Sequence, residues 1–312
     1  MPIIAGPLGV KPGPGITLPG QRDAAQATWH APDGTMWPLT NWSAGWWTLD
    51  EVSGLGAVPI TLSTAPAPRG GARVQRITDE PRLITWPLHV WGNSHTEFLD
   101  RWRRVGHAFT QTSLLGPGIL VISRPDGTAR EIEAYYQDGW FDQPGAGHTY
   151  DDAVLTLFCE DGYFRDREPT RIVREYAVAG DFLDPYPSIS SGQVLGDTVI
   201  QVGGQAMAWP DWTITGPASL ITATNTTAGT GFVLNPDWDG DGPLLDGQTV
   251  RITTDPPTVR GPAGEIWTGA LVRPGARLWG MLPGPNQVVL QIDGAGDGTR
   301  IELTYKRRWQ TA

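Results

Sequence analysis

Residues 94–109 read SHTEFLDRWRRVGHAF and predict a helix in a chain that otherwise reads as β-strands. Ser94 is a preferred N-cap residue, and Glu97 follows at the spacing of a capping box, in which the two residues satisfy backbone N–H groups at a helix start. Large apolar residues recur at helical spacing and form one stripe, namely Phe98, Trp102, Val105 and Phe109. Charged residues occupy the other side, so we expect a helix of about three to four turns that packs on a sheet.

Strand patterns lie on both sides of this helix. RLITWPLHVWG (82–92) alternates apolar and polar residues, and Pro87 favours an edge strand or a bulge. After the helix, residues 118–140 read as a hairpin that turns at Pro125-Asp126-Gly127, and residues 153–166 add another strand. The single Cys159 lies in that strand, where we expect it to be a small buried hydrophobic residue.

The composition predicts short strands and about two domains. The 312 residues include 40 Gly and 28 Pro, which favours many turns. After a linker-like stretch at 180–196, no helical period appears and short strands recur at the spacing of a sandwich or jelly roll. We therefore predict a mainly β chain with an arm at 1–26, a β-sandwich-like domain at 27–180 that carries the helix, and a β-sandwich at 181–312. The last strand could stay with the second sandwich or return to the first domain.

Several classes of function have no support in the sequence. A net charge of −10 disfavours nucleic acid as a partner. Neither a secretory signal nor an apolar run long enough for a membrane span is present, so we expect a protein of the cytoplasm. The chain has no nucleophile elbow, no phosphate-binding loop and no zinc motif among its five histidines. A pair of carboxylates for glycoside hydrolysis cannot be selected from sequence, and we do not expect an enzyme.

Residues 237–248, DWDGDGPLLDGQ, match the opening of a calcium loop. Asp237, Asp239 and Asp241 stand at its first, third and fifth positions, and Gly242 follows. The twelfth position is Gln248, which cannot give the bidentate ligation that a glutamate supplies there. The flanking segments read as strands, so the stretch also fits an ordinary connection in a sandwich. No cofactor is expected, with calcium at these three aspartates as the alternative.

Two sets of residues are candidates for an interface. Arg101, Arg103 and Arg104 could bind carboxylates of a partner or form a solvated helix face. Trp46 and Trp47 could contact a neighbouring subunit, fill a β core, or join other tryptophans in a sugar-stacking surface.

The order of these motifs resembles that of siphophage distal tail (Dit) proteins. In the first half, W-G-x-S-x-x-E-x-x-x-x-W leads into the helix, and G-x-L-x-x-x-R-P-D-G-T-x-R and C-E-D-G-Y-F-R-D follow. In the second half, P-x-W-T-I-T-G-P-A (210–218), G-Q-T-V-R-I-T-T-D (247–255) and L-P-G-P-N-Q-V (282–288) occur in order. The resemblance covers the chain from about residue 27 and implies a galectin-like C-terminal sandwich.

The resemblance also implies a role in assembly. Distal tail proteins form six-fold rings at the end of the tail tube and link it to tail-tip or tail-associated lysin proteins, and often to receptor-binding proteins. A ring is a heterologous interface that closes on itself. It implies a virion protein that assembles in the cytoplasm of a bacterial host. The alternative is a carbohydrate-binding protein that attaches the virion to cell-wall sugars.

Overall fold

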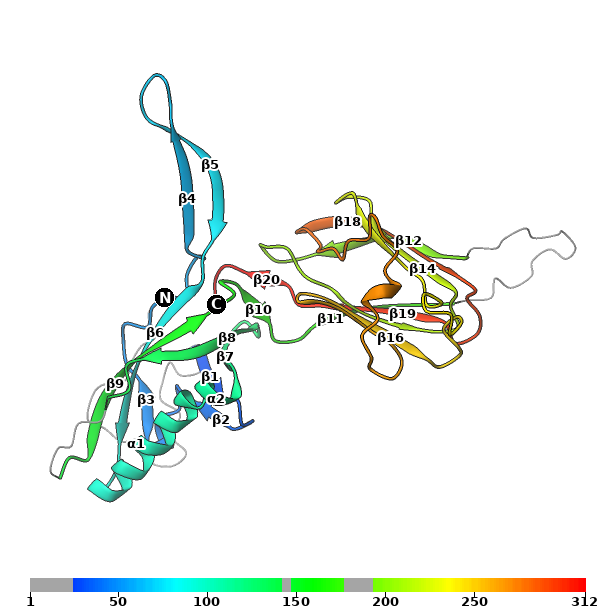
Figure 1. Cartoon of the computed structure of the whole chain (residues 1–312). Helices are drawn as coiled ribbons and strands as arrows, with labels where there is room; N and C mark the ends of the chain where they lie inside the picture. Colours follow the sequence, from blue (N-terminus) through cyan, green and yellow to red (C-terminus); the bar gives the residue numbers. More distant parts are fainter. Residues whose placement is uncertain (1–24, 142–146, 177–192) are drawn as a thin grey trace, which may run out of the picture. The chain divides into compact units, whose positions relative to one another are not determined.

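The structure is a computed structural model that describes residues 25–141, 147–176 and 193–312 (Figure 1). Residues 1–24 of the expected arm and 180–192 of the expected linker lie outside the described residues. The chain divides into two compact units. The first unit ends at Arg167 and also contains Trp309–Ala312, and the second unit is Glu168–Arg308.

A nine-stranded sheet forms the framework of the first unit. Its main path runs β2-β1-β7-β8-β9-β6-β3, with β10 and β20 paired beside it. Neighbours along the path are antiparallel. The strands are β1 (Gln26–His30), β2 (Met36–Pro38), β3 (Trp46–Thr48), β6 (Arg82–Trp91), β7 (Gly118–Ser123), β8 (Ala129–Asp138), β9 (Tyr150–Cys159), β10 (Phe164–Asp166) and β20 (Arg308–Trp309).

Strand β6 lies inside the sheet, so the expectation that Pro87 marks an edge is wrong. β6 pairs with β9 over its whole length and with β3 on its other side. The β3 pairs cover only Leu88–Val90, so Pro87 lies just past the end of β3. The Pro87 carbonyl still accepts from the Leu49 N–H at 3.0 Å, but proline cannot donate the return bond, and the ladder ends there.

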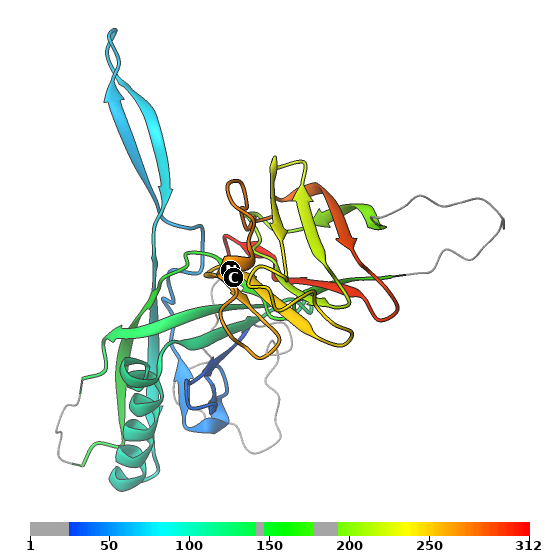
Figure 2. The same ribbon diagram turned by 45° about the vertical axis from the view of Figure 1, so that its right-hand side comes forward.

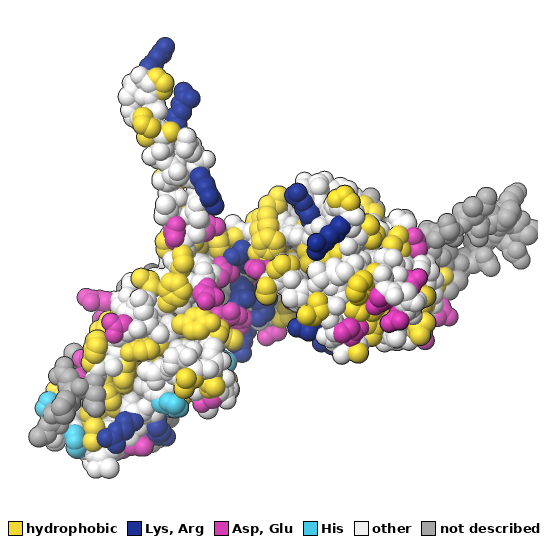
Figure 3. Space-filling view, in the orientation of Figure 1, with side chains coloured by type: hydrophobic (Ala, Val, Ile, Leu, Met, Phe, Trp, Pro, Cys, Tyr) yellow, Lys and Arg dark blue, Asp and Glu magenta, His cyan; other side chains and the backbone are white. Residues whose placement is uncertain are grey.

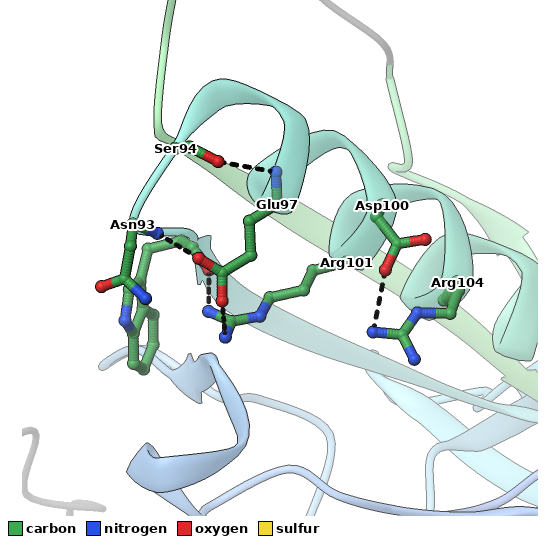
Figure 4. A network of polar contacts seen from close by, with 7 residues as sticks. Asn93, Ser94, Glu97, Asp100, Arg101 and Arg104 are labelled. Carbon is green, nitrogen blue, oxygen red and sulfur yellow. Dashed lines mark hydrogen bonds and ion pairs between the residues drawn. The ribbon is translucent and has the colours of Figure 1, made fainter.

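The predicted helix is confirmed as α1 (His95–Thr110). Ser94 is its N-cap, and the Ser94 Oγ accepts a hydrogen bond from the Glu97 N–H at 3.2 Å. The return bond of the capping box differs, because Glu97 Oε2 accepts from the N–H of Asn93 at 2.7 Å and not from that of Ser94 (Figure 4). A four-residue helix, α2 (Thr112–Leu115), follows. The described helices include none that is long and apolar enough to cross a membrane.

The apolar stripe of α1 is buried against the sheet, as its spacing predicts. All four stripe residues belong to the core of the first unit, together with side chains from β1, β6, β7, β8 and β9. Trp29 of β1 stacks on Phe109 with ring centroids 4.9 Å apart, and its indole N–H donates to the Ala108 carbonyl at 2.8 Å. On the other side, the Trp140 ring lies 4.2 Å from the Trp102 ring. Gly106 permits this approach, because a Cβ there would lie 2.3 Å from the Trp140 Nε1.

The second unit is a β-sandwich, which confirms that part of the predicted fold class. One sheet has the order β11-β19-β13-β16-β17 and the other β12-β18-β14-β15. Trp212 is buried in its core, with its ring 5.7 Å from Phe232 and 5.2 Å from Trp279, both edge-on. The strands are β11 (Thr170–Glu175), β12 (Gln193–Val202), β13 (Asp211–Thr215), β14 (Leu220–Asn225), β15 (Thr230–Leu234), β16 (Thr249–Thr254), β17 (Pro257–Arg260), β18 (Gly284–Asp293) and β19 (Arg300–Tyr305).

The units divide earlier in the sequence than residue 180. Strand β11 falls within the range 27–180, yet it pairs along its whole length with β19 of the second unit. Cys159 lies in β9 and is fully buried, as expected. Burial raises the pKa of its thiol to about 12.

A hairpin of β4 (Ile60–Pro66) and β5 (Ala72–Asp79) forms a separate two-stranded sheet. It projects away from the nine-stranded sheet of its own unit in both views (Figures 1 and 2). Neither strand contributes a buried residue. The hairpin therefore belongs to the first unit without sharing its core.

Replacing Trp102 tests the helix stripe. We expect Trp102→Ala to destabilise the first unit by about 3–5 kcal/mol, because the side chain is almost fully buried between the helix and Trp140. Thermal unfolding followed by circular dichroism should show a melting temperature lower by about 10 °C. Leu114→Ala is the control, since Leu114 is exposed and should have no effect. An unchanged melting temperature for Trp102→Ala would show that the stripe does not hold the unit together.

Candidate assembly surfaces

The β4–β5 hairpin has one apolar face. Leu62 pairs with Ile77, and Thr64 pairs with Val74, because a bulge at Gln75 shifts the register between these pairs. Side chains alternate between faces along β4, so Leu62 and Thr64 share a face, and their partners share it too. The bulge thus brings Val74 and Ile77 to the same side, although they are three residues apart. Four large side chains on this face are exposed, namely Ile60, Leu62, Val74 and Ile77.

The opposite face of the hairpin is polar and basic. Arg73 and Arg76 pair with Ala65 and Ser63 on that face, and Arg69 lies in the connecting turn. Residues 60–79 contain three arginines and one aspartate, which is a net charge of +2. The whole chain carries −10, so −12 remains for the rest. Figure 3 shows basic and hydrophobic side chains together on the projecting hairpin.

A buried arginine joins the segments at one end of the first unit. Arg82 of β6 is 1% exposed, and its guanidinium donates to backbone carbonyl oxygens only, namely those of Gly54, Gly56, Gly162 and Gln310. The bond to Gly162 is 2.8 Å long and the bond to Gln310 is 2.7 Å. The cation also lies 5.0 Å from the centre of the Phe164 ring. Burial lowers the pKa of Arg82 from its ordinary value.

The last residues of the chain are held by further contacts within the first unit. The Trp309 indole N–H donates to Asp166 at 2.7 Å, and the Arg130 guanidinium lies 4.2 Å from the Trp309 ring centre. Arg130 also donates to the Thr311 carbonyl at 2.6 Å, and Arg124 donates to the Ala312 carbonyl at 3.1 Å. The chain thus leaves the first unit after β10 and returns to it beside β10, while β19 remains in the second unit.

The three helix arginines do not act as one group. Arg101 is directed inward: it pairs with Glu97 and donates to the Trp91 carbonyl at 2.6 Å (Figure 4). Arg104 forms a 3.0 Å pair with Asp100 on the exposed side of the helix. Arg103 is exposed. Arg103 and Arg104 are therefore accessible to a partner, and Arg101 is used to fix the helix start.

Trp46 and Trp47 belong to an aromatic cluster. Trp47 is buried and contacts Trp42 edge-on at 5.9 Å, and Trp42 lies 4.5 Å from Trp91. Trp46 is half-buried and donates its indole N–H to the Pro38 carbonyl at 2.8 Å. The indole N–H groups of Trp42 and Trp47 have no acceptor among the described residues. The rings of this cluster pack on one another at the end of β6 and do not form a flat exposed aromatic surface.

The aspartate stretch is an exposed connection between β15 and β16. Asp237 Oδ1 accepts from the Gly242 N–H at 2.9 Å, and Asp239 Oδ1 accepts from the Asp241 N–H at 3.3 Å. Two of the three carboxylates therefore form the turn itself. Among the described residues no group of three His, Cys, Asp or Glu side chains could hold a metal ion.

Comparison with solved structures shows which known proteins share this fold. The chain resembles the Dit (gp 19.1) protein of phage SPP1 with a TM-score of 0.62, over 91% of this chain and 99% of that one, at 11% identity. The chain has the fold of a phage distal tail protein. Chains of the phage p2 baseplate, solved in its activated conformation with Ca and with Sr, match with TM-scores of 0.55 and 0.54 at 12% and 14% identity. Each comparison covers 93% of this chain and all of the other.

At the level of the fold, the resemblance that the motifs suggest is confirmed. No protein-family model matches the chain, and no curated protein matches it. The SPP1 protein is described as a paradigm of the hub adsorption apparatus in phages that infect Gram-positive bacteria.

Sequence reasoning missed the two most informative features. The hairpin has a signal, because ITLST and VQRIT flank a Pro-Arg-Gly-Gly turn, but its alternation looks like that of a covered strand. Arg82 has a signal in the alternation of β6, because it stands on the same buried positions as Ile84 and Trp86, but that pattern does not say which groups bind its guanidinium.

Replacing Arg82 tests the buried hydrogen bonds. We expect Arg82→Met to destabilise the first unit by about 3 kcal/mol, because four carbonyl oxygens lose their donor in a buried site. Denaturant titration measures the free energy of unfolding. Hydrogen exchange should show that the backbone amides of residues 309–312 lose protection in Arg82→Met. Arg103→Met removes the same charge from an exposed position and should change neither quantity. If both variants unfold alike, Arg82 does not hold the end of the chain.

A titration tests the calcium alternative. Because the carboxylates of Asp237 and Asp239 accept backbone hydrogen bonds, we expect calcium to leave the melting temperature unchanged. Calorimetry should likewise detect no heat of binding. A rise in melting temperature that a chelator reverses, and that Asp241→Asn removes, would establish a calcium site.

Proposed function

We propose that this chain is a structural component of a phage tail tip, where copies of it form a ring at the distal end of the tail tube. The observation that carries this proposal is the agreement of fold with the SPP1 Dit protein over 91% of this chain and 99% of that one. Agreement over both units, at full length, supports a shared architecture and argues against a single borrowed domain.

In this proposal the two units have different tasks. The first unit, with its nine-stranded sheet and packed helix, forms the ring through a heterologous interface that closes with six copies. The second unit is a sandwich that meets tail-tip, tail-associated lysin or receptor-binding proteins, and the ring meets the tail tube protein. The chain assembles in the bacterial cytoplasm and resides in the virion.

The proposed role is that of a scaffold without catalysis. The similar structures are a hub protein and baseplate chains, which supports a structural role. The carbohydrate-binding alternative has less support, because Trp47 and Trp212 are buried and Trp46 is half-buried. Trp238 is the tryptophan of the second unit with the most accessible ring, at 42% exposed.

Electron microscopy of the virions of the phage that encodes this chain tests the proposal. Gold-labelled antibodies against the second unit should bind at the distal end of the tail tube, and class averages of the tail tip should contain a six-fold ring. Pre-immune antibodies are the control. Label on the capsid or along the tube, or virions that lack the chain, would reject a tail-tip role. A ring with another number of copies would correct the stoichiometry alone.

A further inference from the structure

The hairpin presents an apolar surface that its own chain does not cover. Ile60, Leu62, Val74 and Ile77 lie on one face and are each at least half exposed, from 50% for Leu62 to 61% for Ile77. A contiguous exposed apolar patch on a projecting element is typical of an interaction site. The bulge at Gln75 is what aligns Val74 with Ile77, so the face depends on an irregularity of the strand.

An isolated hairpin also needs support. A two-stranded sheet is marginally stable in water unless a further surface covers one side of it. All residues of β4 and β5 are exposed or half-buried, so the first unit does not supply that surface. The alternation of apolar and basic residues between the two faces is the pattern of a strand pair with one face covered.

The charge of the hairpin indicates what covers it. The hairpin carries +2, and the rest of the chain carries −12. Another copy of the chain is therefore an oppositely charged surface, and such complementarity steers association and fixes orientation. On the first unit of that copy, Leu83 of β6 and Tyr150 and Val154 of β9 share one face of the sheet and are exposed by 52%, 61% and 54%. Asp151 and Asp152 lie on β9 beside it.

We infer that the hairpin of one copy packs its apolar face on the first unit of a second copy. Each copy then offers one hairpin and receives one, so the contact is head-to-tail. This inference rests on the proposed ring, which needs a contact of that kind. Arg73 and Arg76 lie on the other face of the hairpin, outside this contact, and their charge steers association with the acidic neighbour.

Photo-crosslinking tests which molecule the hairpin meets. Benzoylphenylalanine is placed in the full chain at Leu62, on the apolar face, or at Thr61, on the opposite face of the same strand. Isotope-labelled and unlabelled copies are mixed and irradiated, both as purified chain and in assembled tails. We expect Leu62 to give cross-links between labelled and unlabelled copies, and Thr61 to give few. Equal yields from both positions, no products between copies in either sample, or products with another tail protein alone would overturn the inference.

A pair of charge variants measures the strength of the contact. Leu62→Asp should weaken self-association at least about tenfold in analytical ultracentrifugation, since a carboxylate would be buried in an apolar contact. Thr61→Asp adds the same charge on the other face and should leave self-association within about twofold of the original chain. Both variants should melt at the original temperature, because neither side chain is buried.

The outcomes separate this inference from the proposed function. Virions with Leu62→Asp that keep a complete ring with gold label at the tail tip would overturn the hairpin contact and leave the tail-tip role intact. Cross-links between copies of a chain that is absent from the tail would reject the tail-tip role and leave the hairpin contact intact.

Discussion

The hydrogen bonds of one buried cation fix the arrangement of the first unit. The Arg82 guanidinium is enclosed within the fold and donates to four carbonyl oxygens from three separate segments, one of which is the end of the chain. A buried charge is costly unless its donors are satisfied, so these segments cannot separate without leaving the cation unsolvated. The Phe164 ring also packs on this cation, and Trp309, which precedes Gln310 in the sequence, packs on Arg130. The loops before β4, the turn after β9 and the returning tail are therefore linked as one set.

The elements whose formation depends on residues close together in the sequence could be predicted from it. The helix follows from its stripe and cap, and the sandwich follows from the spacing of short strands. What lies far apart in sequence could not be predicted. Arg82 meets Gln310 across more than two hundred positions, and no local pattern identifies that partner. The Trp46–Trp47 pair had three interpretations, a subunit contact, a β core and a sugar-stacking surface, because pattern cannot tell a core aromatic from a surface one.

The β4–β5 hairpin shows a different limit of prediction from sequence. Its strands alternate as covered strands do, and that pattern correctly indicates one apolar face. The pattern does not say whether the covering surface belongs to the same molecule. In the first unit the helix stripe is covered by the sheet of its own chain, whereas the hairpin face is not. The same rule thus yields a core in one element and an open surface in the other. The arginines of α1 differ in a similar way, since Arg101 faces inward and Arg103 outward from neighbouring positions.

The second unit is an insertion, and this has a mechanical consequence. The chain leaves the first unit after Arg167 and re-enters at Trp309, and the Trp309–Asp166 hydrogen bond places exit and return side by side. Any force that pulls on the second unit is therefore shared by two backbone crossings and not borne by one tether. The same geometry makes the inserted sandwich exchangeable, because a replacement need only begin and end at adjacent points. A module attached in this way can change its binding surface while the body that carries the load stays the same.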